Sequence, residues 1–211
     1  MTNLEDALVA VDAGADAIGF VFYEKSPRCV TVETAREIVR KLPEHVEKVG
    51  VFVEESVVRA DEVLRLSGLT AAQVYSKSMA EWLAWHRSNA RKLMIAVPGD
   101  VMNGEFLVPG GTSEKPLDAI VVDSGSGECP GGTGERFDWE RAKMGIWAVE
   151  EHVPVVVAGG LTPDNVSGAI RTLRPWGVDV VSGVEASPGK KDSEKMRAFV
   201  RAVRETDRRV S

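Results

Sequence analysis

Short apolar runs rich in valine and isoleucine alternate along this chain with segments in which apolar residues recur every three or four positions. Side chains repeat every two residues in a strand and about every 3.6 residues in a helix, so the runs predict buried strands and the longer segments predict amphipathic helices. Strands are expected over residues 17–22, 46–52, 72–75, 93–97, 119–123, 153–157 and 178–181.

Helices are predicted between these strands, over residues 32–42, 57–66, 79–85, 139–150 and 193–203. A capping box of Thr2 and Glu5 predicts that the chain opens with a further helix, and another is expected to begin at Thr162, with Pro163 in its first turn. Residues 98–117 interrupt the alternation of strands and helices, since their glycines and prolines leave little room for a regular helix. We therefore expect a degraded helix there.

The alternation of strands and helices predicts an α/β protein whose parallel sheet is closed, or nearly closed, into a barrel. The 211 residues can bury one ordinary core, and no linker or shift in composition divides them. Residues 1–211 are therefore expected to form one domain. A doubly wound open sheet is the alternative fold, although such a sheet normally binds its ligand at a single switch point.

Polar motifs follow directly after three of the predicted strands. They are Asp123 with the glycine loop 131–134, the pair Gly159 and Gly160, and the pair Ser182 and Gly183. Parallel barrels build their sites at the carboxyl ends of strands, where glycine amides approach a phosphate and a carboxylate can move a proton. We expect catalysis at Asp123 and phosphate binding at both pairs; a strand cap and ordinary turns are the structural alternatives.

The charge and cysteine content narrow the classes of partner. A net charge of −6 with scattered basic residues argues against nucleic acid or an anionic membrane. Cys29 and Cys129 form neither a disulfide framework nor a metal-ligand pattern, so we expect no metal and a reducing compartment. No apolar stretch approaches the roughly 20 residues of a membrane span, and the start lacks a signal-peptide pattern. A cytoplasmic protein that binds a small molecule is expected.

Short strings spread over nearly the whole chain form a specific ordered set. They are Thr2–Leu8, Gly19–Tyr23 with Lys25–Arg28, Val49–Val53, Asp123-Ser124, Gly131–Gly134 with Phe137–Trp139, Ala158–Leu161 with Asn165-Val166, and Val178–Glu185 with Pro188–Asp192. Each string is weak alone. Together they closely resemble phosphoribosylanthranilate isomerase, the (β/α)8 TIM-barrel enzyme of tryptophan biosynthesis.

The resemblance implies an Amadori rearrangement of N-(5-phosphoribosyl)anthranilate to an open-chain 1-deoxyribulose 5-phosphate, without metal or cofactor. A general acid opens the furanose ring, and a general base then removes the C2′ proton. The acid matches Asp123, and Arg28 would hold the anthranilate carboxylate through a bidentate contact. The other implied substrate-binding residues are Gln73, Asp179 and, in a lid-like loop, Gly132 and Gly134.

The sequence departs from the family pattern at two places. The family base is a cysteine in a Lys-Ile-Cys-Gly string on the first strand, and that string is absent here. We therefore expect a missing or truncated first strand, impaired activity, and unpaired sheet edges that lower stability. Cys29 or Cys129 as a replacement base is a minor alternative, because neither lies on a rigid strand. The second departure is Tyr75, where the family usually has histidine.

Two other functions stay open. One is a non-catalytic phosphate-ligand-binding barrel or subunit, completed by a partner chain or a swapped protomer. The other is a related sugar-phosphate isomerase, such as the aminoimidazole carboxamide isomerase of histidine synthesis, although the chain lacks two similar halves with an aspartate in each. The expected ligand is a small phosphorylated molecule, and the expected assembly is a monomer or a homodimer.

Overall fold

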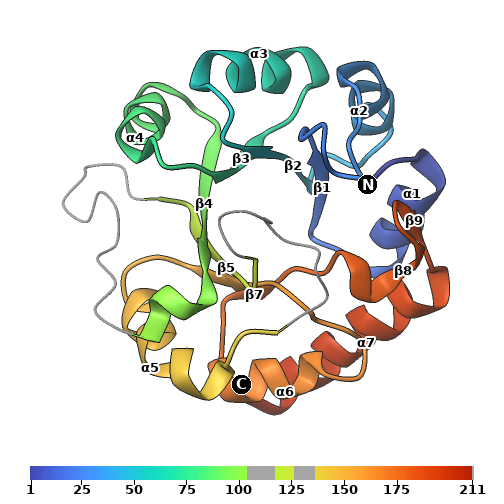
Figure 1. The fold of residues 1–211 in the computed structure, drawn as a ribbon. Coiled ribbons are helices and arrows are strands. Elements are labelled where there is room, and N and C mark those ends of the chain that lie inside the picture. The colour runs from blue at the N-terminus through green and yellow to red at the C-terminus, as the bar shows by residue number, and fades with distance from the viewer. Residues whose placement is uncertain (104–116, 126–135, 211) are drawn as a thin grey trace.

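Seven parallel strands form one curved sheet, and the helices lie on its outer side (Figure 1). The structure is a computed structural model, and it describes residues 1–103, 117–125 and 136–210. The strands follow chain order: β1 (Ala17–Val21), β2 (Glu47–Val53), β3 (Ala71–Tyr75), β4 (Lys92–Pro98), β5 (Ala119–Asp123), β6 (Val155–Val157) and β7 (Gly177–Val178). The barrel-type parallel sheet is confirmed. The doubly wound sheet, which carries helices on both faces, is wrong.

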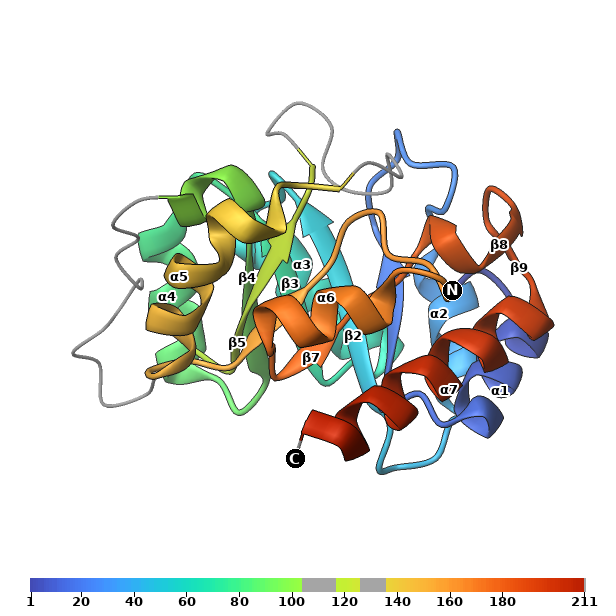
Figure 2. The same ribbon diagram turned by 90° about the horizontal axis from the view of Figure 1, so that it is seen from below.

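The helices cover the outside of this sheet. They are α1 (Leu4–Ala13), α2 (Val32–Val39), α3 (Val57–Ser67), α4 (Met79–Ser88), α5 (Trp139–Glu150), α6 (Val166–Leu173) and α7 (Ser193–Val210). Figure 2 shows the layers from the side, with α6 and α7 lying across the outside of the strands. The predicted helix 139–150 matches α5, whereas α7 continues beyond the predicted end at residue 203.

Alternating side chains along the strands build two apolar layers. Phe20 and Phe52 are buried in the larger layer, between the sheet and the helices, where Phe52 lies 6.4 Å from Trp82 of α4 between ring centroids. The smaller layer consists of Ala96, Val121 and Ala158, with Tyr75, Met94 and Val156 packed against them. Successive residues of a strand point to opposite faces, so this second layer lines the inside of the barrel. Its small side chains leave room for the polar residues at the strand ends.

The two edges of the sheet are β1 and β7. In the sheet formed by the described residues, β1 pairs only with β2, and β7 pairs only with β6. The first residues of the chain lie beside β1, where the amino group of Met1 donates a hydrogen bond to the carbonyl oxygen of Gly19. The sheet thus curves around a centre without a ladder between its first and last strands.

The first helix begins differently from the prediction. Asn3, not Thr2, is the N-cap of α1, and its side-chain oxygen accepts a hydrogen bond from the backbone N–H of Asp6 at 2.8 Å. The hydroxyl of Thr2 donates instead to the carbonyl oxygen of Gly189, far along the chain. A tertiary contact has taken the side chain that the local capping pattern would use, so the capping box of Thr2 and Glu5 is wrong.

The predicted helix start at Thr162 is also wrong, because α6 begins at Val166. The side chain of Asn165 accepts a hydrogen bond from the N–H of Thr162 and donates one to the carbonyl of Gly160, both at 2.9 Å. These two bonds hold residues 162–164 in a turn. An asparagine side chain that bonds backbone groups in this way competes with helix formation.

The end of the chain contains a hairpin that periodicity did not predict. The strand expected over 178–181 ends at Val178, and a 3-10 helix, η2 (Ser182–Val184), follows. The strands β8 (Glu185–Ser187) and β9 (Lys190–Lys191) then pair antiparallel. Strands of two and three residues are too short to show an alternating pattern, so only the turn residues Pro188 and Gly189 could have indicated them.

The region after β4 begins with a 3-10 helix, η1 (Gly99–Asn103), in place of a regular α-helix. The remainder of the predicted degraded helix, residues 104–116, lies outside the described residues. Within the described ranges, no helix is both long and apolar enough to cross a membrane.

A close approach of α5 to η1 yields a stability prediction. A Cβ at Gly145 would lie 2.1 Å from the carbonyl oxygen of Met102, so the substitution Gly145→Ala must displace backbone. We expect it to lower the free energy of unfolding by about 2 kcal/mol, the usual range for overpacking. Gly168→Ala is the matched control, because its Cβ would meet only Trp139, at 3.6 Å. Alanine is the better helix former, so the control should gain up to about 1 kcal/mol. Equal urea midpoints for both variants would contradict this packing.

A carboxyl group at the end of α5 makes stability depend on pH. Burial raises the pKa of Glu150 to about 7, against hydrogen bonds from the backbone of Trp176 and Val155. Within the described part of the chain, its Oε2 is buried and has no hydrogen-bond partner. The unfolded chain loses this proton near the ordinary value, so the stabilisation is complete below that value and is lost as the pH rises through about 7.

The substitution Glu150→Gln should therefore flatten the pH dependence of stability. Because Glu150 is only partly buried, we expect the variant to gain about 1 kcal/mol over the wild type at pH 8 and little at pH 5. Thermal unfolding at both pH values measures the difference. A gain of the same size at pH 5 and pH 8 would show that ionisation is not its cause.

Candidate active site

Asp123 lies at the carboxyl end of β5 and is buried, with 4% of its surface exposed. Its Oδ2 accepts a hydrogen bond of 2.7 Å from the hydroxyl of Tyr75, which ends β3. Its Oδ1 lies 3.2 Å from the backbone nitrogen of Gly125 and 3.4 Å from the hydroxyl of Ser124. Gln73, two residues before Tyr75, donates from its side-chain nitrogen to the Tyr75 hydroxyl at 3.4 Å. The structure thus brings Gln73 and Asp123 together through Tyr75.

A second carboxylate, Asp179, follows directly after β7. Burial raises its pKa, and the negative charge of Asp123 raises it further, whereas the positive charge of Lys191 acts in the opposite direction. Two neighbouring carboxylates repel each other when both are ionised, so the charge of Asp123 favours the protonated form of Asp179.

The two predicted phosphate-binding pairs lie on adjacent segments. Gly159 and Gly160 follow β6 with φ angles of +79° and +61°, in the left-handed region that favours glycine. Ser182 and Gly183 begin η2, and a Cβ at Gly183 would lie 1.9 Å from the carbonyl oxygen of Leu161. The two segments are therefore in direct backbone contact. Backbone N–H groups from adjacent glycine-rich loops can together surround a phosphate.

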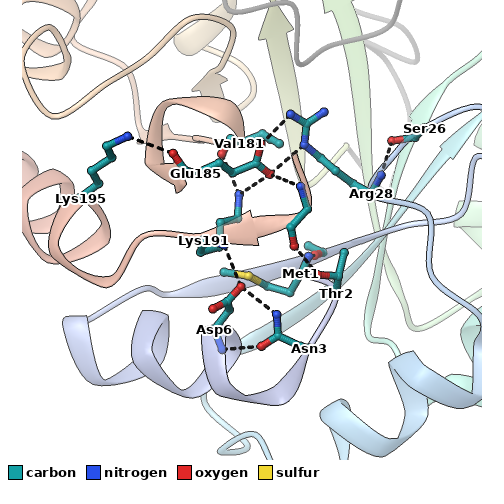
Figure 3. A network of polar contacts seen from close by, with 12 residues as sticks. Met1, Thr2, Asn3, Asp6, Ser26, Arg28, Val181, Glu185, Lys191 and Lys195 are labelled. Atoms are coloured by element: carbon teal, nitrogen blue, oxygen red, sulfur yellow. Dashed lines mark hydrogen bonds and ion pairs between the residues drawn. The ribbon is translucent and has the colours of Figure 1, made fainter. Parts of the chain in front are cut away.

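Arg28, which was expected to hold a substrate carboxylate, makes a bidentate ion pair with Glu185 (Figure 3). Its Nε and Nη2 donate to the two carboxylate oxygens at 2.8 and 2.7 Å. Lys191 contacts Glu185 Oε1 at 3.4 Å and donates to the carbonyl of Val181 at 2.7 Å. The Glu185 side chain is only 6% exposed, so this cluster is shielded from water.

The charges in this cluster stabilise one another. Burial alone would raise the pKa of Glu185, but the hydrogen bonds from Arg28 and the positive charges of Lys191 and Arg28 hold it below its ordinary value. Burial lowers the pKa of Lys191, and the charge of Glu185 opposes that change. The hairpin also contacts α1, because the backbone N–H of Lys191 donates to Asp6 at 2.8 Å. Glu185 therefore orients Arg28 and connects the loop after β1 to the hairpin.

The cysteines and the glycine loop were further candidates. Cys29 is exposed in the loop after β1, and its pKa is raised by burial and by the charge of Glu24, so less of it is thiolate at neutral pH. Cys129, Gly132 and Gly134 lie outside the described residues. No group of three His, Cys, Asp or Glu side chains in the described part is arranged to hold a metal ion.

The sequence profile described as N-(5'phosphoribosyl)anthranilate (PRA) isomerase matches residues 1–202. An N-(5'-phosphoribosyl)anthranilate isomerase from Pseudomonas fluorescens (strain Pf0-1) is 43% identical over 205 residues, which make up 97% of this chain and 95% of the relative. The chain belongs to the phosphoribosylanthranilate isomerase family. The resemblance seen in its motifs is confirmed.

Solved structures of the phosphoribosylanthranilate isomerase family have the same fold. The enzyme from Thermus thermophilus is similar with a TM-score of 0.82 and 31% identity, covering 97% of this chain and 96% of that one. A phosphoribosyl anthranilate isomerase solved in complex with reduced 1-(o-carboxyphenylamino)-1-deoxyribulose 5-phosphate has a TM-score of 0.77 and 34% identity, covering 97% and 95%. The (β/α)8 fold class is therefore shown.

Residue types alone did not single out Glu185 or Lys191, although both lie in strings that resemble this isomerase family. Their signal was weak, because a glutamate and a lysine on a surface hairpin are most often solvated. Tyr75 was noted as a departure from the family pattern, and the structure places its hydroxyl directly on Asp123. The cluster around Arg28 and the bond from Tyr75 both depend on residues that are distant in sequence.

The buried ion pair predicts a large effect of one substitution. Glu185→Gln would leave Arg28 and Lys191 without their countercharge, and breaking a buried pair from one side costs about 3 kcal/mol at neutral pH. The loss should shrink as the pH falls through the lowered pKa of Glu185, because the wild-type carboxylate then takes up a proton as well. Urea unfolding at pH 7 and at pH 3 measures both quantities.

Glu62→Gln is the matched control for this prediction. Glu62 pairs with Arg59 at 2.5 Å, but their side chains are 47% and 53% exposed. Such surface pairs contribute less than about 1 kcal/mol. A similar, small loss in both variants would contradict a structural role for the buried cluster.

Proposed function

We propose that this chain is an isomerase that converts N-(5-phosphoribosyl)anthranilate into 1-(2-carboxyphenylamino)-1-deoxyribulose 5-phosphate in L-tryptophan biosynthesis. The observation that carries the proposal is the position of Asp123. It is a buried carboxyl group on the last residue of β5, and Tyr75 donates a hydrogen bond to it. Its charge acts on Asp179, and it lies at the rim where the two glycine segments meet. Membership in the isomerase family supports the same reaction.

In the proposed reaction Asp123 donates a proton to the furanose ring oxygen, and the carbon–oxygen bond breaks to leave a Schiff base. A general base then removes the C2′ proton to give an enolamine, which gains a proton at C1′ and loses the proton of its C2′ hydroxyl to become the ketone. No oxidant, metal or cofactor enters this sequence, since atoms and electrons balance within the substrate. Asp179, whose pKa is raised by burial and by the charge of Asp123, lies beside the proposed acid.

The substrate's two anionic ends match two features of the site. The segments containing Gly159, Gly160, Ser182 and Gly183 would bind the phosphate through backbone N–H groups. Arg28 would hold the anthranilate carboxylate, with its guanidinium oriented by Glu185 from the opposite side. Gln73, Gly132 and Gly134 complete the proposed substrate contacts.

The proton-abstracting base is the unassigned group of this mechanism. The family resemblance implies a cysteine on a strand in a Lys-Ile-Cys-Gly string, which this sequence does not contain. The described sheet has no ladder between β1 and β7, the place where a further strand would complete the barrel. We therefore propose that such a strand supplies the base, and that the 211-residue chain by itself turns over slowly.

The loss of phosphoribosylanthranilate fluorescence tests the reaction and the base together. We expect slow turnover by the 211-residue chain and at least about a hundredfold more by a chain extended upstream by a Lys-Ile-Cys-Gly strand, the range in which a positioned base contributes. Asp123→Asn in the extended chain should lower kcat by about 10³-fold relative to the extended chain that keeps Asp123. Asp12→Asn is the control, because Asp12 is 68% exposed in a surface pair with Arg197.

The outcomes of this experiment separate the alternatives. Equal activity with and without the added strand would move the base to a residue of the present chain. Activity in neither form, together with tight binding of the product, would favour the non-catalytic binding protein and contradict the isomerase. Full activity of Asp123→Asn would remove Asp123 from the role of general acid.

A further inference from the structure

The side chain of Tyr75 spans from one strand end to another across the strand between them. Tyr75 is the last residue of β3, Asp123 is the last residue of β5, and β4 lies between these strands. The tyrosine packs against the inner layer that contains Ala96 of β4. Because Ala96 carries only a methyl group, the ring can pass over β4 and bring its hydroxyl within 2.7 Å of Asp123 Oδ2.

The direction of this hydrogen bond is determined by chemistry. Burial raises the pKa of Tyr75 well above its ordinary value, and the charge of Asp123 and the hydrogen bond to it raise it further. The phenol therefore keeps its proton at every pH at which an enzyme works. Because the phenol keeps its O–H, Tyr75 is the donor and Asp123 Oδ2 the acceptor, and a carboxyl oxygen can accept this bond whether or not the group carries a proton. Gln73 donates to the same phenol oxygen at 3.4 Å and orients it.

We propose that Tyr75 is a positioning residue for the general acid: its hydroxyl fixes the rotation of the Asp123 carboxyl group and stabilises the negative charge that Asp123 acquires when it gives up its proton. This inference rests on the proposed function, in which Asp123 protonates the ring oxygen. A hydrogen bond to a carboxylate is stronger than one to a neutral acid. The contact therefore strengthens as the proton leaves, and an interaction that strengthens in this way lowers the barrier.

A histidine at this position, as the family resemblance implies, would act differently. Its ring can carry a positive charge near neutral pH, whereas tyrosine stays a neutral donor throughout. Beside the two carboxylates Asp123 and Asp179, a neutral donor orients the acid without adding a positive charge that would draw the proton away. Tyrosine therefore suits this position in this chain.

The kinetic test is the substitution Tyr75→Phe, in the form of the chain that gives the higher turnover. We expect kcat to fall about tenfold, with KM changed less than about twofold, because a hydrogen bond to a charged group is lost in the transition state. A purely structural role would lower stability and leave the kcat of the folded enzyme unchanged, which would overturn the proposal.

A titration tests the contact without turnover. The chain has two tyrosines, so Tyr23→Phe leaves Tyr75 as the only ionisable phenol, visible by ultraviolet difference absorbance. Adding Asp123→Asn removes the neighbouring negative charge and should lower the pH of phenol ionisation by about one unit or more. An unchanged midpoint in a chain that circular dichroism shows to be folded at that pH would mean that Tyr75 does not bond to Asp123 and would overturn the proposal, even if Tyr75→Phe fails to fold.

The two measurements distinguish failure of this inference from failure of the proposed function. Tyr23→Phe alone serves as the kinetic control, because it removes one phenol hydroxyl that makes no described hydrogen bond to the site, and kcat should stay within about twofold. If Asp123→Asn shifts the midpoint of phenol ionisation but no substrate is turned over, the isomerase is contradicted and the Tyr75 contact stands. If substrate is turned over but the midpoint does not shift, only the contact is contradicted.

Discussion

Parallel pairing of the strands is the constraint on which the site depends. Each of the first seven strands is hydrogen-bonded to its neighbour in the same direction, so every carboxyl end reaches the same rim. Val74 lies opposite Ile95, and Ile95 lies opposite Ile120. Asp123 therefore stands two residues beyond the level of Tyr75, and the tyrosine side chain spans that step to reach it. A slip by one residue would turn each of these side chains to the other face.

Charged side chains gather at this rim. The charge of Asp123 raises the pKa of Asp179, while Arg28 and Lys191 converge on Glu185. The cationic cluster is held by contacts between the loop after β1 and the hairpin after η2, which are far apart in sequence. Burial strengthens the interactions between these charges, since charges interact more strongly where water is excluded. The substrate proposed for this site carries two anionic groups, which the proposed phosphate segments and Arg28 would bind.

Close backbone contacts hold the connecting segments in place. Gly183 touches the carbonyl of Leu161, and Gly145 touches that of Met102. At both positions a side chain would collide with backbone. Glycine is therefore needed there so that two backbone segments can pack closely, and not for flexibility. One contact joins the segments proposed to bind phosphate, and the other holds α5 against η1 after β4. A close contact between glycine and backbone therefore occurs both at the rim and in the outer layer.

The amino-acid pattern by itself determined the alternation of strands and helices, the parallel class of the sheet and the candidates Asp123, Gly159 and Gly183, because apolar periodicity and glycine motifs are local signals. The tertiary structure alone decided the cap at Asn3, the turn before Val166, the hairpin 185–191 and the partners of Arg28. Thr2, which leaves the cap to Asn3, bonds to the distant Gly189, and Arg28 bonds to the distant Glu185. The side chain of Asn165 bonds to nearby backbone in competition with the helix. Local propensity does not predict which of the possible hydrogen bonds forms, because the outcome depends on the burial and proximity that the whole sheet creates.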